Sequence, residues 1–117
     1  MNSTPKRSMS RRADSASVAS VAGFAALTEK AWQSQVLDLA KLFGWRYYHT
    51  FDSRRSVAGF PDLALFRPGR FLLVELKAEK GKLSPSQENM IADLRAARVE
   101  VHVFRPSDFD AAVEVLR

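Results

Sequence analysis

The sequence predicts a small α/β domain in which helices pack on a central mixed sheet of about four strands. Three observations predict this class. Helical and strand-like hydrophobic patterns alternate along the chain from residue 28 onward. A proline-glycine turn joins two short apolar stretches into a hairpin. The 117 residues are 46% hydrophobic and 26% charged, which suits one compact domain and excludes a wholly disordered chain.

The first 27 residues differ from the rest in composition. They hold six serines and four basic residues and show no sustained periodicity. We therefore expect residues 1–27 to form a basic Ser/Arg-rich N-terminal arm that is partly disordered. A targeting peptide is the alternative, because basic residues precede a mildly apolar run, but that run is poor in leucine and lacks a clear cleavage site. The folded domain is then expected over residues 28–117.

The first helix is expected to begin after Thr28, which is a suitable N-cap. Apolar residues then recur at steps of three and four, and Gly44 marks the end of the pattern. These residues are Trp32, Val36, Leu39 and Phe43. Residues 45–51 are rich in aromatic side chains and predict the first strand, and residues 52–61 predict a loop.

Residues 63–66 and 71–76 predict two strands joined by an Arg-Pro-Gly-Arg turn. Proline followed by glycine is typical of a type II turn, because glycine supplies the positive φ at the second central position. If Arg67 and Arg70 pair, opposed residues in the hairpin have numbers that sum to 137. Both faces of the hairpin are apolar near the turn, so we expect two central strands with helices covering both sides.

The end of the chain predicts a helix, a strand and a helix. The run Ser-Pro-Ser-Gln at 84–87 combines a serine cap, a proline at the first helical position and a glutamine three residues after the cap. Alternating valines at 99–103 predict a strand, and Ser107 is expected to cap the last helix. The expected order of elements is α-β-β-β-α-β-α.

The hairpin register places Asp62 opposite Glu75, on the same face as Lys77. Opposed carboxylates repel each other, and partial burial makes the repulsion more costly. A divalent cation between the two carboxylates would turn this repulsion into attraction. Mg²⁺ prefers one or two carboxylates together with waters and phosphate oxygens. The alternative is a structural ion-pair network in which Lys77 bridges both acids. The opposed register and the surrounding positive charge favour the metal, Mg²⁺ or Mn²⁺.

Charge and composition limit the classes of binding partner and of chemistry that we expect for this protein. The formal net charge is +5, and residues 46–82 carry eight positive against four negative side chains, which favours a polyanion such as nucleic acid. The absence of cysteine excludes disulfides, thiolate zinc sites and cysteine nucleophiles. No stretch is long and apolar enough to span a bilayer, so we expect no membrane partner.

These motifs together resemble a known family. Pro61-Asp62 followed by Glu75-Leu76-Lys77 resembles the active-site motif of the PD-(D/E)XK nuclease superfamily. The wider context, Gly-Phe-Pro-Asp at 59–62 and Gly-Lys-Leu-Ser-Pro-Ser-Gln at 81–87, resembles its VRR-NUC (virus-type replication-repair nuclease) branch. The resemblance covers about residues 28–117. It implies a restriction-endonuclease-like core and an endonuclease that hydrolyses DNA phosphodiester bonds with a divalent metal.

The resemblance also implies roles for the hairpin residues. Asp62 and Glu75 should ligate Mg²⁺ or Mn²⁺, joined by the backbone carbonyl of Leu76. Lys77 should position or activate the attacking water. No other cofactor is implied.

Two residues outside the hairpin also match the family. Glu29 matches an acidic residue on the first helix that lies near the metal in relatives. Gln87 matches the motif glutamine, and its alternative role is that of the reciprocal capping partner of Ser84. Both readings of Gln87 stay open.

Four basic residues near the motif are candidates for binding the nucleic-acid backbone, because guanidinium and ammonium groups suit phosphate oxygens. They are Arg54, Arg55, Lys80 and Lys82. For the two arginines, a solvated loop face is the alternative.

The resemblance further implies structure-selective cleavage of branched DNA, such as four-way (Holliday) junctions, by a homodimer acting in DNA repair or recombination. It suggests a phage or bacterial protein that acts in the bacterial cytoplasm. Two alternatives are a nicking or restriction-type endonuclease, and a non-catalytic basic DNA-binding accessory protein whose acids form only an ion-pair network.

Overall fold

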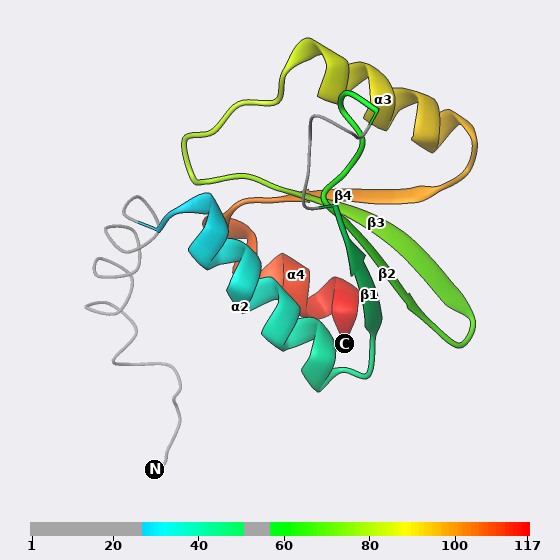
Figure 1. Ribbon diagram of the computed structural model, residues 1–117. Coiled ribbons are helices and arrows are strands. Elements are labelled where there is room, and N and C mark those ends of the chain that lie inside the picture. The colour runs from blue at the N-terminus through cyan, green and yellow to red at the C-terminus, as the bar shows by residue number, and fades with distance from the viewer. Residues whose placement is uncertain (1–26, 51–56) are drawn as a thin grey trace.

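The computed structural model describes residues 27–50 and 57–117. Within these residues the order of elements is the expected α-β-β-β-α-β-α, with one added 3₁₀ turn before the last helix (Figure 1). In chain order the elements are α2 (Glu29–Leu42), β1 (Arg46–His49), β2 (Leu63–Arg67), β3 (Arg70–Leu76), α3 (Pro85–Ala96), β4 (Glu100–Phe104), η1 (Pro106–Asp108) and α4 (Phe109–Leu116).

The four strands form one mixed sheet in the order β1-β2-β3-β4. The first two pairs are antiparallel, and β3 and β4 are parallel. The β2–β3 register pairs Leu63 with Val74 and Arg67 with Arg70, which confirms that opposed residue numbers sum to 137. Gly69 has a φ of 84°, so the turn uses glycine for the positive φ that the sequence predicts. As expected, β2 and β3 are the central strands.

Helices cover both faces of the sheet (Figure 1). One face packs against α2 and α4 around a buried cluster. From the strands this cluster contains Leu63, Leu65, Leu72, Val74 and Leu76. The other face packs against α3 in a smaller cluster built on Leu73, Ile91 and Val101. The alternation of side chains along each strand thus divides the apolar residues between two cores.

Two buried tryptophans tie distant segments to the larger core. The indole Nε1 of Trp32 donates to the carbonyl oxygen of Phe104 at 2.9 Å, and that of Trp45 donates to Leu116 at 2.8 Å. Both side chains are nearly inaccessible to solvent. They therefore belong to the core, as their position on and beside the first helix predicts.

Two local expectations were wrong. Helix α3 does not cover the sheet up to the hairpin turn, so Phe66 and Phe71 stay 37% and 52% exposed. The cause is that α3 packs over β4 and the middle of the hairpin rather than over its end.

Ser107 is not the cap of the last helix. Pro106 instead opens a 3₁₀ turn before that helix. The Asp108 carboxylate caps this turn by accepting from the backbone N–H of Arg105 at 2.8 Å.

In the part of the chain that the structure describes, none of the helices has the length and apolar character that crossing a bilayer requires.

Candidate active site

The hairpin register continues to the two acids beyond the end of β2. Leu63 pairs with Val74, so the next pair outward is Asp62 with Glu75. Asp62 is held in this position by two backbone contacts. Its Oδ2 accepts from the backbone N–H of Leu76 at 3.1 Å, and its carbonyl oxygen accepts from the N–H of Thr50 at 3.1 Å. The sheet therefore brings the two predicted carboxylates together.

Glu75 is the only buried charged residue among those the structure describes, with 1% of its surface exposed. Burial, followed by the negative charge of Asp62, raises the pKa of Glu75 from 4.5 to about 8, while Lys77 acts in the opposite direction. Its Oε1 is buried and has no hydrogen-bond partner in the described structure. A buried oxygen without a hydrogen-bond partner is destabilising, so Glu75 Oε1 is suited to a group that binds oxygen, such as a metal cation.

Gln87 satisfies the other oxygen of Glu75. Its Nε2 donates to Glu75 Oε2 at 3.0 Å. Its Oε1 accepts from the backbone N–H of Ser84 at 2.8 Å, and its own N–H donates to Ser84 Oγ at 3.1 Å. The capping box thus fixes the side chain that holds the buried acid. The two readings of Gln87 are therefore compatible, because one amide group makes both contacts.

This geometry predicts different results for Gln87→Ala and Ser84→Ala. Each variant loses a helix cap and should lose about 1 kcal/mol of stability. Only Gln87→Ala removes the donor that favours the charged form of Glu75, so its pKa should rise further. Divalent-metal affinity at neutral pH should then fall roughly tenfold in Gln87→Ala and stay unchanged in Ser84→Ala. Calorimetric Mn²⁺ titration, with thermal unfolding of both variants, measures this difference. Equal metal affinities would restrict Gln87 to capping.

The segment before Asp62 is packed tightly against the start of α3. Gly59 has a φ of 86°, and a Cβ at this position would lie 2.3 Å from the carbonyl oxygen of Ser86. This close approach places Phe60 and Asp62 beside Gln87, where they line a cleft of about 280 Å³. The other lining residues are Thr50, Val57, Ala58 and Gly59. The sequence shows that Gly59 belongs to a motif, but it does not show that Gly59 contacts the start of α3.

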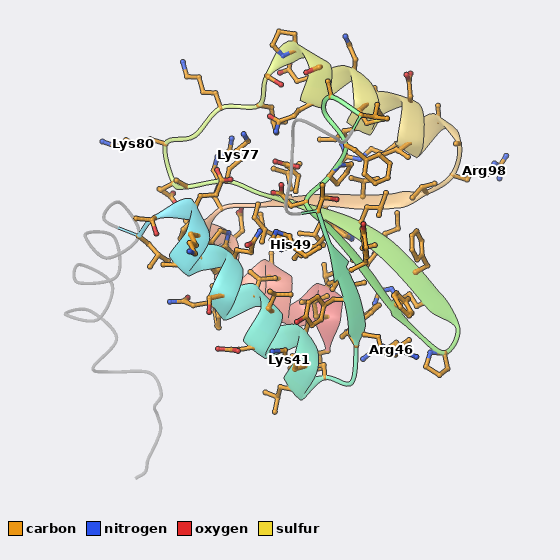
Figure 2. The ribbon with its side chains drawn as sticks, viewed as in Figure 1. Lys41, Arg46, His49, Lys77, Lys80 and Arg98 are labelled. Carbon is orange, nitrogen blue, oxygen red and sulfur yellow. The ribbon has the colours of Figure 1, made fainter. Side chains whose placement is uncertain are left out.

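Lys77 directly follows β3, and its backbone N–H donates to the carbonyl of Phe104 at 3.1 Å. It lies close enough to Glu75 to lower the pKa of that acid. Lys80 and Lys82 are exposed, and Lys80 projects outward from the loop after β3, away from Lys77 (Figure 2). Lys77 is therefore the lysine of the acid site, and the other two are at the surface of the same loop.

Two residues that the sequence did not single out fix this loop. The guanidinium of Arg105 donates twice to the carbonyl of Gly81, at 2.7 and 3.2 Å. Glu79 Oε1 accepts from the backbone N–H of Ser107 at 2.9 Å. Both contacts join the loop to η1, more than 20 positions away, and no local pattern predicts them.

The remaining predicted residues lie at different distances from the acid pair. Glu29, in the first turn of α2, is near enough to raise the pKa of Glu75, as the weakest of its causes. Within residues 27–50 and 57–117, it does not join Asp62 and Glu75 in a cluster of three ligands that could hold a metal. Leu76 is buried in the larger core. Arg54 and Arg55 lie outside the described residues.

The residues present fit a divalent cation. Asp62 and Glu75 supply two hard oxygen donors, and the unpartnered Glu75 Oε1 is one of them. Burial, and then repulsion by Asp62, raises the pKa of Glu75, and a cation bound between the two acids would oppose both effects. Two carboxylates are also the number that Mg²⁺ commonly takes from a protein when waters and phosphate oxygens complete its shell.

The fold and the site together define a class, the α/β domains with a restriction-endonuclease-like core, here with two acids and a lysine at one end of its central hairpin. The model of the VRR-NUC domain family matches residues 9–108, and the chain belongs to that family of nucleases. The match begins inside residues 1–27, and the boundary between arm and domain at residue 28 stays a prediction. Comparisons with curated proteins and with solved structures found no match.

Proposed function

We propose that this nuclease is an endonuclease that requires Mg²⁺ or Mn²⁺ and hydrolyses phosphodiester bonds in branched DNA, four-way junctions above all. The observation that carries the metal requirement is the opposed pair Asp62 and Glu75, with Glu75 buried and one of its oxygens unpartnered. The family supports DNA as the substrate. The central excess of positive charge supports binding of a polyanion.

In this proposal Asp62 and Glu75 hold the cation, with the backbone carbonyl of Leu76. When bound, the cation supplies a Lewis acid and lowers the pKa of a water. Gln87 keeps the Glu75 carboxylate in place, and the backbone N–H of Leu76 does the same for Asp62. Lys77 orients the attacking water and stabilises the negative charge that develops on the phosphoryl oxygens. Water is the nucleophile in this proposal, because the motif of Asp62, Glu75 and Lys77 supplies no hydroxyl or thiol group.

In this proposal the selectivity for branched DNA depends on the protein being a homodimer. Two copies related by a two-fold axis would present two sites to a symmetric junction and make paired nicks. The family resemblance supports this arrangement, together with a role in DNA repair or recombination in a bacterium or its phage, in the cytoplasm. Lys80, Lys82, Arg54 and Arg55 are the proposed contacts to the DNA backbone.

Two other functions remain as alternatives. A nicking or restriction-type endonuclease would use the same site on linear DNA. A basic DNA-binding accessory protein would use the acids and Lys77 only as an ion-pair network. In the described structure no short ion pair joins Lys77 to either acid, and the unpartnered Glu75 Oε1 favours the enzyme.

The proposed function predicts the outcome of one assay. Linear, nicked, flapped and four-way DNA substrates of equal length are incubated with the protein and Mg²⁺ or Mn²⁺, and in parallel with chelator. We expect the four-way substrate to be cut fastest and no cutting in chelator. Fastest cutting of linear DNA would favour the restriction-type alternative. No cutting of any substrate with either metal would favour the accessory protein.

A further inference from the structure

A group of exposed side chains lies on the uncovered part of the sheet. Tyr48, Phe66 and Phe71 are 68%, 37% and 52% exposed, and Arg46 is exposed beside them. We call these four residues the aromatic patch. They lie on the β1–β2–β3 end of the sheet, where the β2–β3 hairpin extends beyond α3 (Figure 1).

The register puts the aromatic patch on the same face as the two acids. Arg46 pairs with Phe66, and Phe66 pairs with Phe71, so these three form one row across the strands. Tyr48 forms the next row with Ala64. The row after that, two residues further along each strand, is the level of Asp62.

The spacing of these rows is short. A strand rises about 3.3 Å per residue, so the aromatic patch begins roughly 7 Å and ends roughly 13 Å from the level of the acids. Figure 2 shows Arg46 at the end of the sheet remote from Lys77. The patch and the acids therefore lie on one face, but Ala64 and Leu73 between them pack against α3. The patch adjoins the site along the edge strand β1, where the exposed Tyr48 lies one row from Thr50 and Asp62, which both line the cleft.

The charge on the aromatic patch indicates what covers it. The guanidinium of Arg46 lies 5.7 Å from the ring centre of Phe66, and no carboxylate pairs with it in the described structure. Arginine and aromatic residues are common at protein interfaces, but a protein partner would have to supply a carboxylate opposite Arg46, since a buried charge without a partner is costly. The substrate of a nuclease carries a phosphate at every nucleotide. A nucleic acid suits both the unpaired arginine and the exposed rings, because its phosphates pair with arginine and its bases stack on aromatic rings.

Fully paired DNA cannot use the rings, because its bases are already stacked on one another. We propose that the aromatic patch binds unpaired nucleotides next to the cleavage site, with bases stacked on Tyr48 and Phe71 and a phosphate on Arg46. This inference rests on the proposed function and deepens it. Within the branched substrates of the proposed function, the preferred DNA is then one in which nucleotides next to the cleaved strand are unpaired, as where the branch point of a four-way junction opens.

The test uses the full chain in chelator, so that binding is measured without cleavage. The probes are a 12-nucleotide single strand that carries 2-aminopurine and a hairpin duplex of the same sequence. Tyr48→Ala combined with Phe71→Ala should weaken binding of the single strand by roughly 5- to 150-fold for each base that loses its ring. Duplex affinity should change by less than about twofold. The quenching of 2-aminopurine fluorescence that accompanies stacking should be lost.

Two further variants test whether the loss of binding comes from the rings of the patch rather than from the loss of any exposed apolar side chain. Leu42→Ala removes an apolar side chain that is 75% exposed on α2, on the other side of the sheet, and should bind both probes like the parent. Tyr48→Leu with Phe71→Leu keeps apolar surface but removes the rings, and it should show the same loss as the alanine variant. This second pair also covers the case in which the alanine variant does not fold.

Three results would overturn the proposal. They are equal loss of single-strand and duplex affinity, no loss of either, and a change in oligomeric state, which would make the aromatic patch a subunit interface. These results are distinct from failure of the proposed function. A parent that binds the single strand through these rings but cuts no DNA would remove the nuclease proposal alone. A parent that cuts DNA while the ring variants bind normally would remove only this inference.

Discussion

Glu75→Gln should abolish Mg²⁺ and Mn²⁺ binding and reduce DNA cleavage by about 10³-fold or more. The amide has nearly the shape of the carboxyl group but carries no charge, so it replaces one of the two carboxylates that the cation needs. Stability in chelator should rise, because the variant removes a buried acid that is repelled by Asp62. Affinity for DNA should be kept. Calorimetric metal titration, a cleavage assay and chemical unfolding measure the three effects.

The same substitution isolates a pH dependence. In the folded protein without metal the pKa of Glu75 is raised from 4.5 to about 8, so the unfolded chain loses this proton first as the pH rises. The contribution of Glu75 to stability is then greatest below about pH 4.5 and is lost as the pH rises toward 8. Unfolding of the parent in chelator should show this decline, and Glu75→Gln should lack it. Metal affinity of the parent should rise by about tenfold per pH unit below 8, because binding displaces a proton.

Lys80→Ala is the control for this site, since it removes a positive charge from the same loop at a position that points away from Lys77. It should lower cleavage only modestly, through weaker DNA binding. Lys77→Ala should lower cleavage by about 10²- to 10⁴-fold with metal binding kept. If Glu75→Gln bound metal and cut DNA like the parent, the acids would be only a structural pair.

Gly59→Ala should cause the largest loss of stability of any small substitution in the site. A methyl group there requires a left-handed φ of 86°, which costs about 1–2 kcal/mol in a residue with a Cβ. It would also lie 2.3 Å from the backbone oxygen of Ser86, and relief of such overpacking costs about 1–3 kcal/mol more. Because the displaced backbone carries Gln87, metal affinity and cleavage should fall as well. Denaturant unfolding and metal titration measure both losses.

Gly69→Ala is the matched control. Gly69 has nearly the same φ, 84°, but a Cβ there would meet nothing within 4 Å. The Gly69→Ala variant should lose only the stability that the left-handed φ costs, about 1–2 kcal/mol, and should keep full metal affinity. Equal losses in the two variants would show that the contact between the Gly59 loop and α3 contributes little.

The sequence by itself determined the order of elements, the hairpin and the pairing of Asp62 with Glu75. These depend on short-range rules: periodicity, the turn glycine and the alternation of side chains along a strand. The start of α3 was equally local, because its capping box lies within four residues. The positions of the two acids could therefore be predicted before any tertiary contact was known.

Only the tertiary structure decided how that site is held. Gln87 reaches Glu75, Gly59 touches Ser86, and Arg105 fixes the loop after Lys77, each across a separation that no periodic pattern encodes. The aromatic patch was likewise decided by where α3 packs, since the sequence predicted a covered hairpin. The physical reason is that burial and side-chain partners depend on which elements meet in space, whereas turns, caps and strand register depend on neighbours along the chain.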